Sequence, residues 1–384
     1  MRSETDIEKE PWWVQKRTEL LNLADRHLNA YVYDLDTVIQ KAGDIQSLGA
    51  VDRTLYAVKA NFNADIIRTL AGAGVDFDCV SPGEVRLLRE VLSDDCEGRI
   101  LFTPNFAPRD EYEWAFREGL CVTLDNLYPL KHWPEIFADR EIFVRIDPDY
   151  GAGHHEHVIT AGVTSKFGVS IDEINELVTL INSAGARVVG IHAHSGSGIL
   201  EPRNWQSVAA VLAGIAARFP DVRTLDLGGG IGVPDRRGLP GFDLAALDEL
   251  LGTVKAEYPD YSLWLEPGRY LVAQAGVLIA HVTQTKEKGG HAYVGVSTGF
   301  NSLIRPALYD AYHEIVNLTQ LDAEATETVT VVGPICETGD KFGTGRAFPP
   351  SNEGDVVLIA NTGAYGYVMS SRYNLRDTPE EIAI

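Results

Sequence analysis

The sequence predicts an α/β fold: a (β/α)8 TIM-like barrel with a second, mostly β C-terminal domain. Between residues 54 and 268, short runs of β-branched and apolar residues alternate with longer stretches of helical period, as in parallel strands joined by crossover helices. The eight runs are TLYAVKA (54–60), VDFDCVS (75–81), RILFTPN (99–105), CVTLDN (121–126), EIFVRIDP (141–148), VVGIHAHS (188–195), TLDLGGG (224–230) and SLWLEPG (262–268). Eight such units favour a closed barrel over an open doubly wound sheet, which would have about six strands and an early GxGxxG turn.

The stretches between these runs have the spacing of amphipathic helices. ADIIRTLAGAG, GEVRLLREVL, INELVTLINSAG and NWQSVAAVLAGIAARF repeat apolar residues three and four positions apart. After residue 270 the helical period disappears, and VAQAGVLIAHVTQTK, HAYVGVST, TVTVVGP and DVVLIANTG follow as strand-like runs joined by loops. We therefore predict a barrel over 37–270 and a β domain formed by 1–36 and 271–384, in which the early run AYVYDLD pairs with the C-terminal strands.

The composition restricts the possible partners and the location. The 384 residues carry a formal net charge of -22, from 33 basic and 55 acidic side chains, and the acidic residues are scattered. Such a surface repels phosphate backbones, which disfavours nucleic acid as a partner. No segment is apolar enough to cross a bilayer, and MRSETDIEKEPWW lacks the apolar stretch of a secretory signal. The four cysteines show no CxxC pairing, so we expect a cytoplasmic protein with free thiols.

Polar side chains gather where the predicted strands end. In barrels of this kind the active site lies at the carboxyl-terminal ends of the strands. Lys59 ends the first run, and burying an ammonium group there without a partner would be costly. The other polar or special residues at these ends are Asp78, His192, His194, Gly228, Gly229, Gly230, Glu266, Gly268 and Arg269. Lys59 is therefore the candidate nucleophile.

A lysine at a barrel mouth can form a Schiff base with a carbonyl group. Two interpretations follow, a cofactor-free lysine aldolase or a lysine that carries pyridoxal 5'-phosphate. The glycine triplet 228–230 favours the cofactor, because its backbone N–H groups can close on a phosphate. Glu266 is placed to pair with the pyridine nitrogen and His194 to stack on the ring. Each feature alone is also compatible with a tight turn, a core histidine or a structural ion pair, but their occurrence at one barrel end favours a cofactor site.

Specific motifs cover nearly the whole chain. They are YAVKAN around Lys59, FDCVSPGEV around Asp78, SKFGV (165–169), HAHSGSG around His194, DLGGGIG (226–232), EPGRY (266–270), LIRPALYDAYH (303–313), GPICETGD (333–340) and GAYGYVMSSRYN (363–374). With these motifs the chain resembles the alanine racemase-like, fold type III pyridoxal-phosphate enzymes, and among them the ornithine/diaminopimelate decarboxylases. Two positions depart from the family pattern, Ser195 where relatives usually carry an apolar residue and Asn361 where an aspartate is expected.

The resemblance implies a role for each of the candidate residues. Lys59 would bind the cofactor aldehyde, His194 would stack on the ring, and Glu266 would pair with the pyridine nitrogen. Asp78 would support this site. The phosphate would be held by Ser197, Gly229, Gly230, Gly268, Arg269 and Tyr365. In the family two subunits share their active sites, so the resemblance implies a homodimer in which Cys336 and Glu337 arrive from the other chain, Cys336 as the proton donor.

The segment LIRPALYDAYH carries the substrate prediction. Arg305 offers a carboxylate clamp and Tyr309 a hydroxyl group, and both resemble the diaminopimelate decarboxylase pattern, in which Arg269, Glu337 and Tyr365 also contact the substrate. The resemblance therefore implies decarboxylation of meso-2,6-diaminopimelate to L-lysine and carbon dioxide, a step of lysine biosynthesis. It also leaves open that the chain is the decarboxylase part of an aspartate kinase fusion.

Other functions stay open at the level of the sequence. A related decarboxylase would act on ornithine, arginine or carboxynorspermidine, and a racemase would need a second acid/base where Cys336 stands. A metal-dependent barrel hydrolase would use His192 and His194 as ligands, and a non-catalytic carrier would only bind the cofactor. The segment GHHEHV holds His154, His155 and His157. Since no cysteine stands near it in the sequence, we interpret it as a polar loop rather than a metal site.

Overall fold

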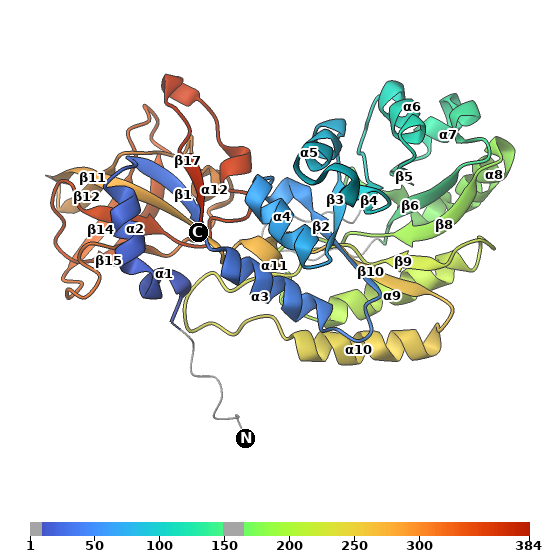
Figure 1. The fold of residues 1–384 in the computed structure, drawn as a ribbon, viewed down its shortest axis with the longest axis horizontal. Helices are drawn as coiled ribbons and strands as arrows, with labels where there is room; N and C mark the ends of the chain where they lie inside the picture. Colours follow the sequence, from blue (N-terminus) through green and yellow to red (C-terminus); the bar gives the residue numbers. More distant parts are fainter. Residues whose placement is uncertain (1–9, 149–164) are drawn as a thin grey trace. The chain divides into compact units, whose positions relative to one another are not determined.

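The structure is a computed structural model that describes residues 10–148 and 165–384. The chain divides into two compact units. One comprises Ile39–Val233 and Gly241–Leu271, and the other comprises the described part of Met1–Val38 together with Pro234–Pro240 and Val272–Ile384. Both ends of the chain thus contribute to the second unit, which is drawn mainly in dark blue, orange and red (Figure 1). Within the described ranges, no helix is long and apolar enough to span a membrane.

The first unit is a closed barrel of parallel strands, which confirms the predicted fold class (Figure 1). Its strands are β2 (Arg53–Ala57), β3 (Asp76–Cys79), β4 (Ile100–Phe102), β5 (Cys121–Leu124), β6 (Glu141–Asp147), β8 (Arg187–His192), β9 (Thr224–Asp226) and β10 (Ser262–Leu265). They lie side by side in the order β5, β4, β3, β2, β10, β9, β8, β6, and the pairing of β5 with β6 closes the ring. Each of the eight runs overlaps one of these strands. The short β7 (Val169–Ser170) pairs with β6 and was not predicted.

Helices precede, connect and follow the barrel strands. They are α3 (Leu35–Gln46), α4 (Ala64–Gly72), α5 (Pro82–Leu92), α6 (Arg109–Arg117), α7 (Tyr128–His132), α8 (Ile174–Ala184), α9 (Arg203–Ala216), α10 (Leu244–Glu257) and α11 (Arg269–Val272), with the 3-10 helices η1 (Val58–Ala60), η2 (Ser93–Cys96), η3 (Pro134–Phe137) and η5 (Ile171–Glu173). The local sequence sets their ends. Ser81 caps α5 by accepting the backbone N–H of Glu84, with Pro82 in the first turn, and Gly185 ends α8 in the left-handed conformation.

Apolar side chains fill the barrel interior toward the amino-terminal ends of the strands. The buried cluster there consists of Leu55, Leu101, Phe143 and Val189. Trp264 packs on Phe143 with ring centroids 5.3 Å apart, and the Arg53 guanidinium lies 4.5 Å from the Trp264 ring centre. A Cβ atom at Gly190 would lie 2.3 Å from the Phe143 ring, so only glycine fits at that position of β8. The barrel is therefore packed solid at this end.

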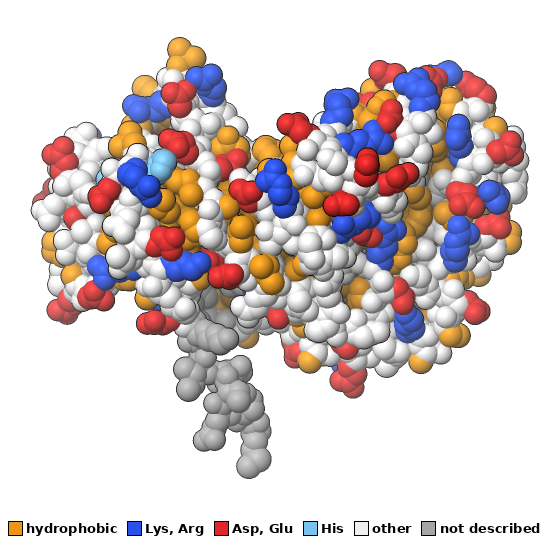
Figure 2. Space-filling view, in the orientation of Figure 1, with side chains coloured by type: hydrophobic (Ala, Val, Ile, Leu, Met, Phe, Trp, Pro, Cys, Tyr) orange, Lys and Arg blue, Asp and Glu red, His pale blue; other side chains and the backbone are white. Residues whose placement is uncertain are grey.

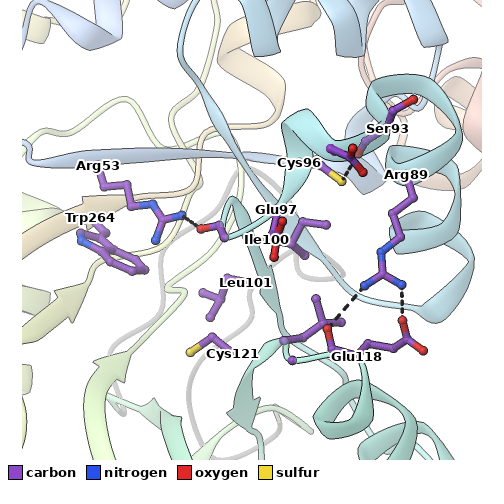
Figure 3. A pocket seen from close by; sticks show the side chains of 14 residues that line it. Arg53, Arg89, Ser93, Cys96, Glu97, Ile100, Leu101, Glu118, Cys121 and Trp264 are labelled. Carbon is purple, nitrogen blue, oxygen red and sulfur yellow. Dashed lines mark hydrogen bonds and ion pairs between the residues drawn. The ribbon is translucent and has the colours of Figure 1, made fainter.

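A surface cavity of about 620 Å³ adjoins this end of the barrel (Figure 3). It is lined by the first residues of three strands, Arg53, Ile100 and Cys121. The cations on its wall are already paired: the Arg53 guanidinium donates to Asp76 and to the Gly98 carbonyl, and Arg89 pairs with Glu118. Because both arginines of this cavity are paired within the protein, and because active sites of such barrels lie at the opposite end, it is not the candidate active site.

The second unit is a β sheet built from both ends of the chain. Its strands are β1 (Asn29–Tyr33), β11 (Gly276–Lys288), β12 (His291–Val296), β13 (Ile315–Asn317), β14 (Glu327–Val332), β15 (Lys341–Phe348), β16 (Val356–Ile359) and β17 (Glu380–Ala383), with helices α1 (Trp12–Gln15), α2 (Arg17–Ala24), α12 (Arg305–Tyr309), η6 (Tyr367–Met369) and η7 (Tyr373–Leu375). The order is β13, β16, β11, β12, β14, β15, and β1 joins β11 antiparallel and β17 parallel.

The long strand β11 organises this sheet. Its first half pairs with β1 and β16, and its second half pairs with β12 after an irregularity between Val282 and Gln284. A buried cluster under α1 and α2 includes Trp13, Leu20, Leu23, Val277, Ile279 and Leu358. Each such side chain contributes about 1.5–3 kcal/mol when it is fully buried. The N-terminal helices are therefore fixed by an apolar core.

Charges of both signs are interspersed over the face of the molecule in Figure 2. This agrees with the scattered acidic residues of the sequence, whose formal net charge is -22. Acidic side chains mixed with lysines and arginines leave no broad basic area on this face of the kind that tracks a phosphate backbone.

Candidate active site

A lysine and a buried aspartate meet at the carboxyl-terminal ends of β2 and β3. Lys59 lies on η1, directly after β2, and Asp78 lies within β3 and is 1% exposed. The Lys59 Nζ atom is 2.9 Å from Asp78 Oδ2, while the lysine side chain remains 38% exposed. Burial and the nearby Glu266 raise the pKa of Asp78, and the Lys59 ammonium opposes this shift. Asp78 thus holds the lysine amine in a fixed position.

A buried carboxylate follows β10 on the other side of β2. Glu266 is 4% exposed, and its Oε2 atom lies 3.1 Å from Nε2 of His192, the last residue of β8. Burial alone would raise the pKa of Glu266, but His192 and the charge of Lys59 outweigh it and lower the pKa to about 2. The Oε1 atom has no hydrogen-bond partner among the described residues. Glu266 is therefore an ionised carboxylate with one oxygen available to an N–H donor.

The glycine turn after β9 contacts a histidine. Gly229 donates its backbone N–H to His194 Nδ1 at 3.1 Å, which assigns the imidazole proton to Nε2. Burial, helped by the positive charges of Arg145 and Lys59, holds the pKa of His194 well below its usual value. His194 is therefore a neutral imidazole, and a flat neutral ring is suited to stacking on an aromatic cofactor.

The glycines at positions 228–230 are required by the geometry of their turn. Gly228 and Gly230 have φ values of +67° and +104°, which disfavour other residues. A Cβ atom at Gly229 would lie 2.2 Å from the Glu266 carbonyl oxygen, and one at Gly230 would lie 2.5 Å from the Gly196 carbonyl oxygen. The turn therefore packs its backbone directly on two neighbouring segments.

Two more predicted residues meet next to this turn. Arg269 donates from Nη2 and Nε to Ser197 Oγ at 3.2 and 3.4 Å. Gly268, which precedes Arg269, packs closely on Ala57 and Ala60, since a Cβ there would lie 3.2 and 3.1 Å from their Cβ atoms. A guanidinium, a hydroxyl group and closely packed glycine backbone are the donor types that bind phosphate.

These residues fit pyridoxal phosphate. An amine held by Asp78 suits the cofactor aldehyde, and the available oxygen of Glu266 suits a protonated pyridine nitrogen. The neutral His194 ring and the glycine turn supply a stacking surface and backbone donors. The structure thus brings together at one barrel end the predicted residues Lys59, Asp78, His194, Ser197, Gly229, Gly230, Glu266, Gly268 and Arg269.

Comparison with known proteins identifies the family. A sequence profile described as the pyridoxal-binding domain of pyridoxal-dependent decarboxylases matches residues 35–273. The chain belongs to this decarboxylase family. The predicted cofactor, pyridoxal 5'-phosphate, and the predicted enzyme class, a carboxy-lyase, are thereby confirmed.

Several relatives of this decarboxylase are named diaminopimelate decarboxylase. It is 38% identical to the diaminopimelate decarboxylase of Methanothermobacter thermautotrophicus over 86% of this chain and 80% of the relative. Identity to the enzyme of Archaeoglobus fulgidus is 36%, over 86% of this chain and 81% of the relative. Among solved structures, diaminopimelate decarboxylase from Helicobacter pylori complexed with L-lysine has a TM-score of 0.86 at 30% identity, covering 95% of this chain and 94% of that one. The predicted resemblance to diaminopimelate decarboxylases is confirmed.

The remaining predicted residues of the decarboxylase belong to the β unit. Cys336 and Glu337 are exposed on the connection between β14 and β15. The backbone N–H of Cys336 donates to Asn374 Oδ1, and the Tyr373 hydroxyl donates to Glu337 Oε1, both at 2.8 Å. Cys336 therefore presents its thiol on a connection that is held at two points.

The two predicted substrate residues of the segment 303–313 lie on the short helix α12. Arg305 is buried, and its Nη1 atom lies 3.3 Å from His313 Nε2. Tyr309 ends the same helix and is partly exposed. Tyr365 has a φ of +56°, a conformation that few non-glycine residues adopt and that often marks functional sites.

Sequence reasoning missed three charged residues at the catalytic end of the barrel. Arg145 on β6 is buried, lies 3.7 Å from Asp125 Oδ1, and stacks over the Phe167 ring at 4.4 Å. Asp226 at the end of β9 is fully buried. The sequence did carry a signal for these residues. RID contains Arg145, and TLD occurs twice, with Asp125 and with Asp226. Each places a charge in an apolar run, as YAVKA does with Lys59.

The hydrolase alternative made a specific structural prediction. It required His192 and His194 as a ligand pair. In the part of the chain that the structure describes, the group able to hold a metal is His192, Asp226 and Glu266, without His194. Family membership decides in favour of the decarboxylase. The segment with His154, His155 and His157 lies outside the described residues.

Proposed function

We propose that this decarboxylase converts meso-2,6-diaminopimelate into L-lysine and carbon dioxide, using pyridoxal phosphate bound at the carboxyl-terminal end of the barrel. The observation that carries the proposal is the pairing of Lys59 with Asp78 beside the ionised, buried Glu266. The substrate follows from the relatives named diaminopimelate decarboxylase, one of which has been solved with L-lysine, the product expected here.

The barrel residues bind and tune the cofactor in this proposal. Bound pyridoxal phosphate supplies an electron sink for the electron pair that remains when carbon dioxide leaves. Lys59 is its covalent attachment point, and Asp78 orients the lysine amine. Glu266 stays ionised and so keeps a proton on the pyridine nitrogen, which makes the ring electron-withdrawing. His194, fixed by the Gly229 N–H, supports the face of the ring.

The phosphate is held by residues that follow β8, β9 and β10. Gly229 and Gly230 offer backbone donors, and Ser197 and Arg269 already contact each other through the serine oxygen. Gly268 permits the close approach of the backbone. We propose Tyr365 as a further phosphate contact. Several fixed donors around one phosphate group would anchor the cofactor in the barrel.

The β unit provides the substrate and proton-transfer groups. Arg305 and Tyr309 bind the distal end of the substrate together with Arg269, Glu337 and Tyr365, since a guanidinium matches a carboxylate. The Cys336 thiol delivers a proton to the carbon that has lost carbon dioxide. Its exposed connection, held by Asn374 and Tyr373, fits a group that serves a second subunit. We therefore propose a homodimer with shared active sites.

One pair of measurements tests the function. Purified protein is expected to absorb as a lysine-bound pyridoxal phosphate, to change its spectrum irreversibly with borohydride, and then to release L-lysine from meso-diaminopimelate. Ornithine and arginine serve as competing substrates in the same assay. Faster turnover of ornithine or arginine than of diaminopimelate, with a normal cofactor spectrum, would mean that the chain is a decarboxylase of another amino acid. A colourless protein after incubation with pyridoxal phosphate would contradict the whole proposal.

Arg305→Ala is expected to raise KM for diaminopimelate by about 30-fold or more, with the cofactor spectrum intact. Truncating one member of a buried charge pair costs about 2 kcal/mol or more, and about 1.4 kcal/mol is a factor of ten. Arg89→Ala is the matched control, because Arg89 forms a surface ion pair with Glu118 at the other end of the barrel. An unchanged KM in Arg305→Ala would remove this residue from the substrate site.

Mixing two inactive variants tests the shared site. Lys59→Met and Cys336→Ala chains, unfolded and refolded together, are expected to regain roughly one quarter of the wild-type activity, because about half of the dimers are mixed and each mixed dimer has one complete site. Each variant refolded alone is the control. No recovery in a mixture that light scattering shows to be dimeric would mean that Cys336 serves the barrel of its own chain.

Partners and location follow from general properties. The described part of the chain has four cysteines without disulfides, as is usual for proteins of a reducing compartment, and we propose a cytoplasmic location. The acidic net charge of -22 disfavours nucleic acid as a partner. A small amino acid is the expected substrate.

A further inference from the structure

Three buried side chains lie together at the carboxyl-terminal ends of three barrel strands. They come from neighbouring strands: His192 ends β8, Asp226 ends β9, and Glu266 follows β10. Their candidate ligand atoms all lie within 4.8 Å of one another, and Asp226 is 0% exposed. The proposed function gives a task to Glu266 but none to Asp226. A carboxyl group in the centre of a barrel needs a physical explanation, because burial of an unpaired charge is costly.

The two carboxyl groups are close neighbours, and each has one oxygen with a protein partner. Asp226 Oδ1 accepts the backbone N–H of Gly228 at 3.0 Å, and Glu266 Oε2 lies against His192. The second oxygens, Asp226 Oδ2 and Glu266 Oε1, have no hydrogen-bond partner among the described residues, and the carboxylate oxygens of the two side chains lie within 4.8 Å of each other. Like charges so close together in a buried site repel each other strongly, which favours the protonated form of one of them. One of the two therefore carries a proton.

The surroundings decide which carboxyl group is neutral. Glu266 has both His192 and Lys59 nearby, and its pKa falls to about 2. Asp226 faces Glu266, Asp78 and the Gly228 N–H, so burial and the Glu266 charge raise its pKa well above the usual value. The proton belongs to Asp226, and its hydroxyl group can donate to the ionised Glu266.

We propose that Asp226 is a neutral positioning residue that ties the glycine turn to Glu266. One oxygen holds Gly228 in its left-handed conformation, and the protonated oxygen holds the Glu266 carboxylate. This inference rests on the proposed function, in which the turn binds the phosphate and Glu266 binds the pyridine nitrogen. A single neutral side chain then sets the distance between the two ends of the cofactor site and leaves one negative charge facing the ring.

Asparagine and alanine at position 226 separate the possible roles. Asp226→Asn keeps an acceptor for Gly228 and a neutral donor for Glu266, so its dissociation constant for pyridoxal phosphate and its kcat/KM are expected within about threefold of wild type. Asp226→Ala removes both bonds and is expected to weaken cofactor binding by roughly 10–100-fold, as for other residues that hold primary ligands. Equal loss in both variants, with both folded by circular dichroism, would overturn the proposal.

Infrared spectroscopy of the protein without cofactor reads the proton directly. Wild type is expected to show the C=O stretch of a buried protonated carboxyl group at neutral pH, and Asp226→Asn to lose it, whereas Glu266→Gln retains it. Absence of the band in wild type would overturn the inference. Loss of the band when a zinc chelator is removed and zinc is added would also overturn it, because a cation would then occupy the cluster. The band does not depend on cofactor binding, so failure of the proposed function would appear separately, as wild-type protein that binds no pyridoxal phosphate.

Discussion

Lys59→Met is expected to abolish the bound-cofactor absorbance and to lower kcat/KM for diaminopimelate by at least about 10³-fold, the scale on which enzymes lose activity when their covalent group is removed. The side chain is similar in length but has no amine, so it cannot bond to the aldehyde. Asp78 then loses the ammonium that lies 2.9 Å away, and burial favours its protonated form. The measurements are the visible absorption spectrum, a borohydride-reduced peptide map and lysine release.

Lys41→Met is the matched control for this variant. Lys41 is also a partly buried lysine of the barrel unit, but its Nζ atom lies over the Tyr270 ring at 4.8 Å, away from Asp78. This control is expected to keep both the cofactor spectrum and the activity. If Lys59→Met kept its activity while mass spectrometry still found the cofactor on another lysine, Lys59 would not be the attachment point.

The barrel was predictable from the sequence because its signals are local. Each strand, from TLYAVKA to SLWLEPG, is a short apolar run followed by an amphipathic helix, and this alternation leaves few topologies. The candidate residues at the strand ends were predictable for the same reason. Lys59, Asp78 and Glu266 stand at the point where a run of buried residues stops, so position and chemistry can be read together.

Elements and residues without such local signals were not predicted from the sequence. The strand β15 reads KFGTGRAF, in which two glycines and two charges hide the alternation, and its pairing with β14 is irregular. Whether a glycine or a charged residue is tolerated in a strand depends on the strand with which it pairs. Asp226 shows the same limit in the site: LDLGGG suggests a turn, but the need for a neutral carboxyl group depends on Glu266, 40 positions later in the chain.

Glu266→Gln is expected to lower kcat by roughly 10²–10³-fold while the cofactor stays bound. The loss is of the size seen when one preorganised electrostatic group of an active site is removed. Glutamine is nearly isosteric, so Lys59 and the phosphate residues still hold the cofactor. The carboxylate with a pKa of about 2 is ionised at every working pH and stabilises a proton on the pyridine nitrogen, whereas a neutral amide cannot. A ring without this proton withdraws electrons poorly when carbon dioxide leaves.

Nitrogen NMR of the variant loaded with ¹⁵N-labelled pyridoxal phosphate separates this electronic effect from misfolding. The pyridine nitrogen signal is expected to move from the protonated to the unprotonated range in Glu266→Gln, and to stay protonated in Glu141→Gln. Glu141 is the matched control because it begins β6 at the opposite end of the barrel and pairs with Arg187 and Arg223 on the surface. If the pyridine nitrogen of Glu266→Gln stayed protonated and kcat were near normal, a group other than Glu266 would stabilise that proton. The buried Glu266–His192 pair would then be a structural contact only.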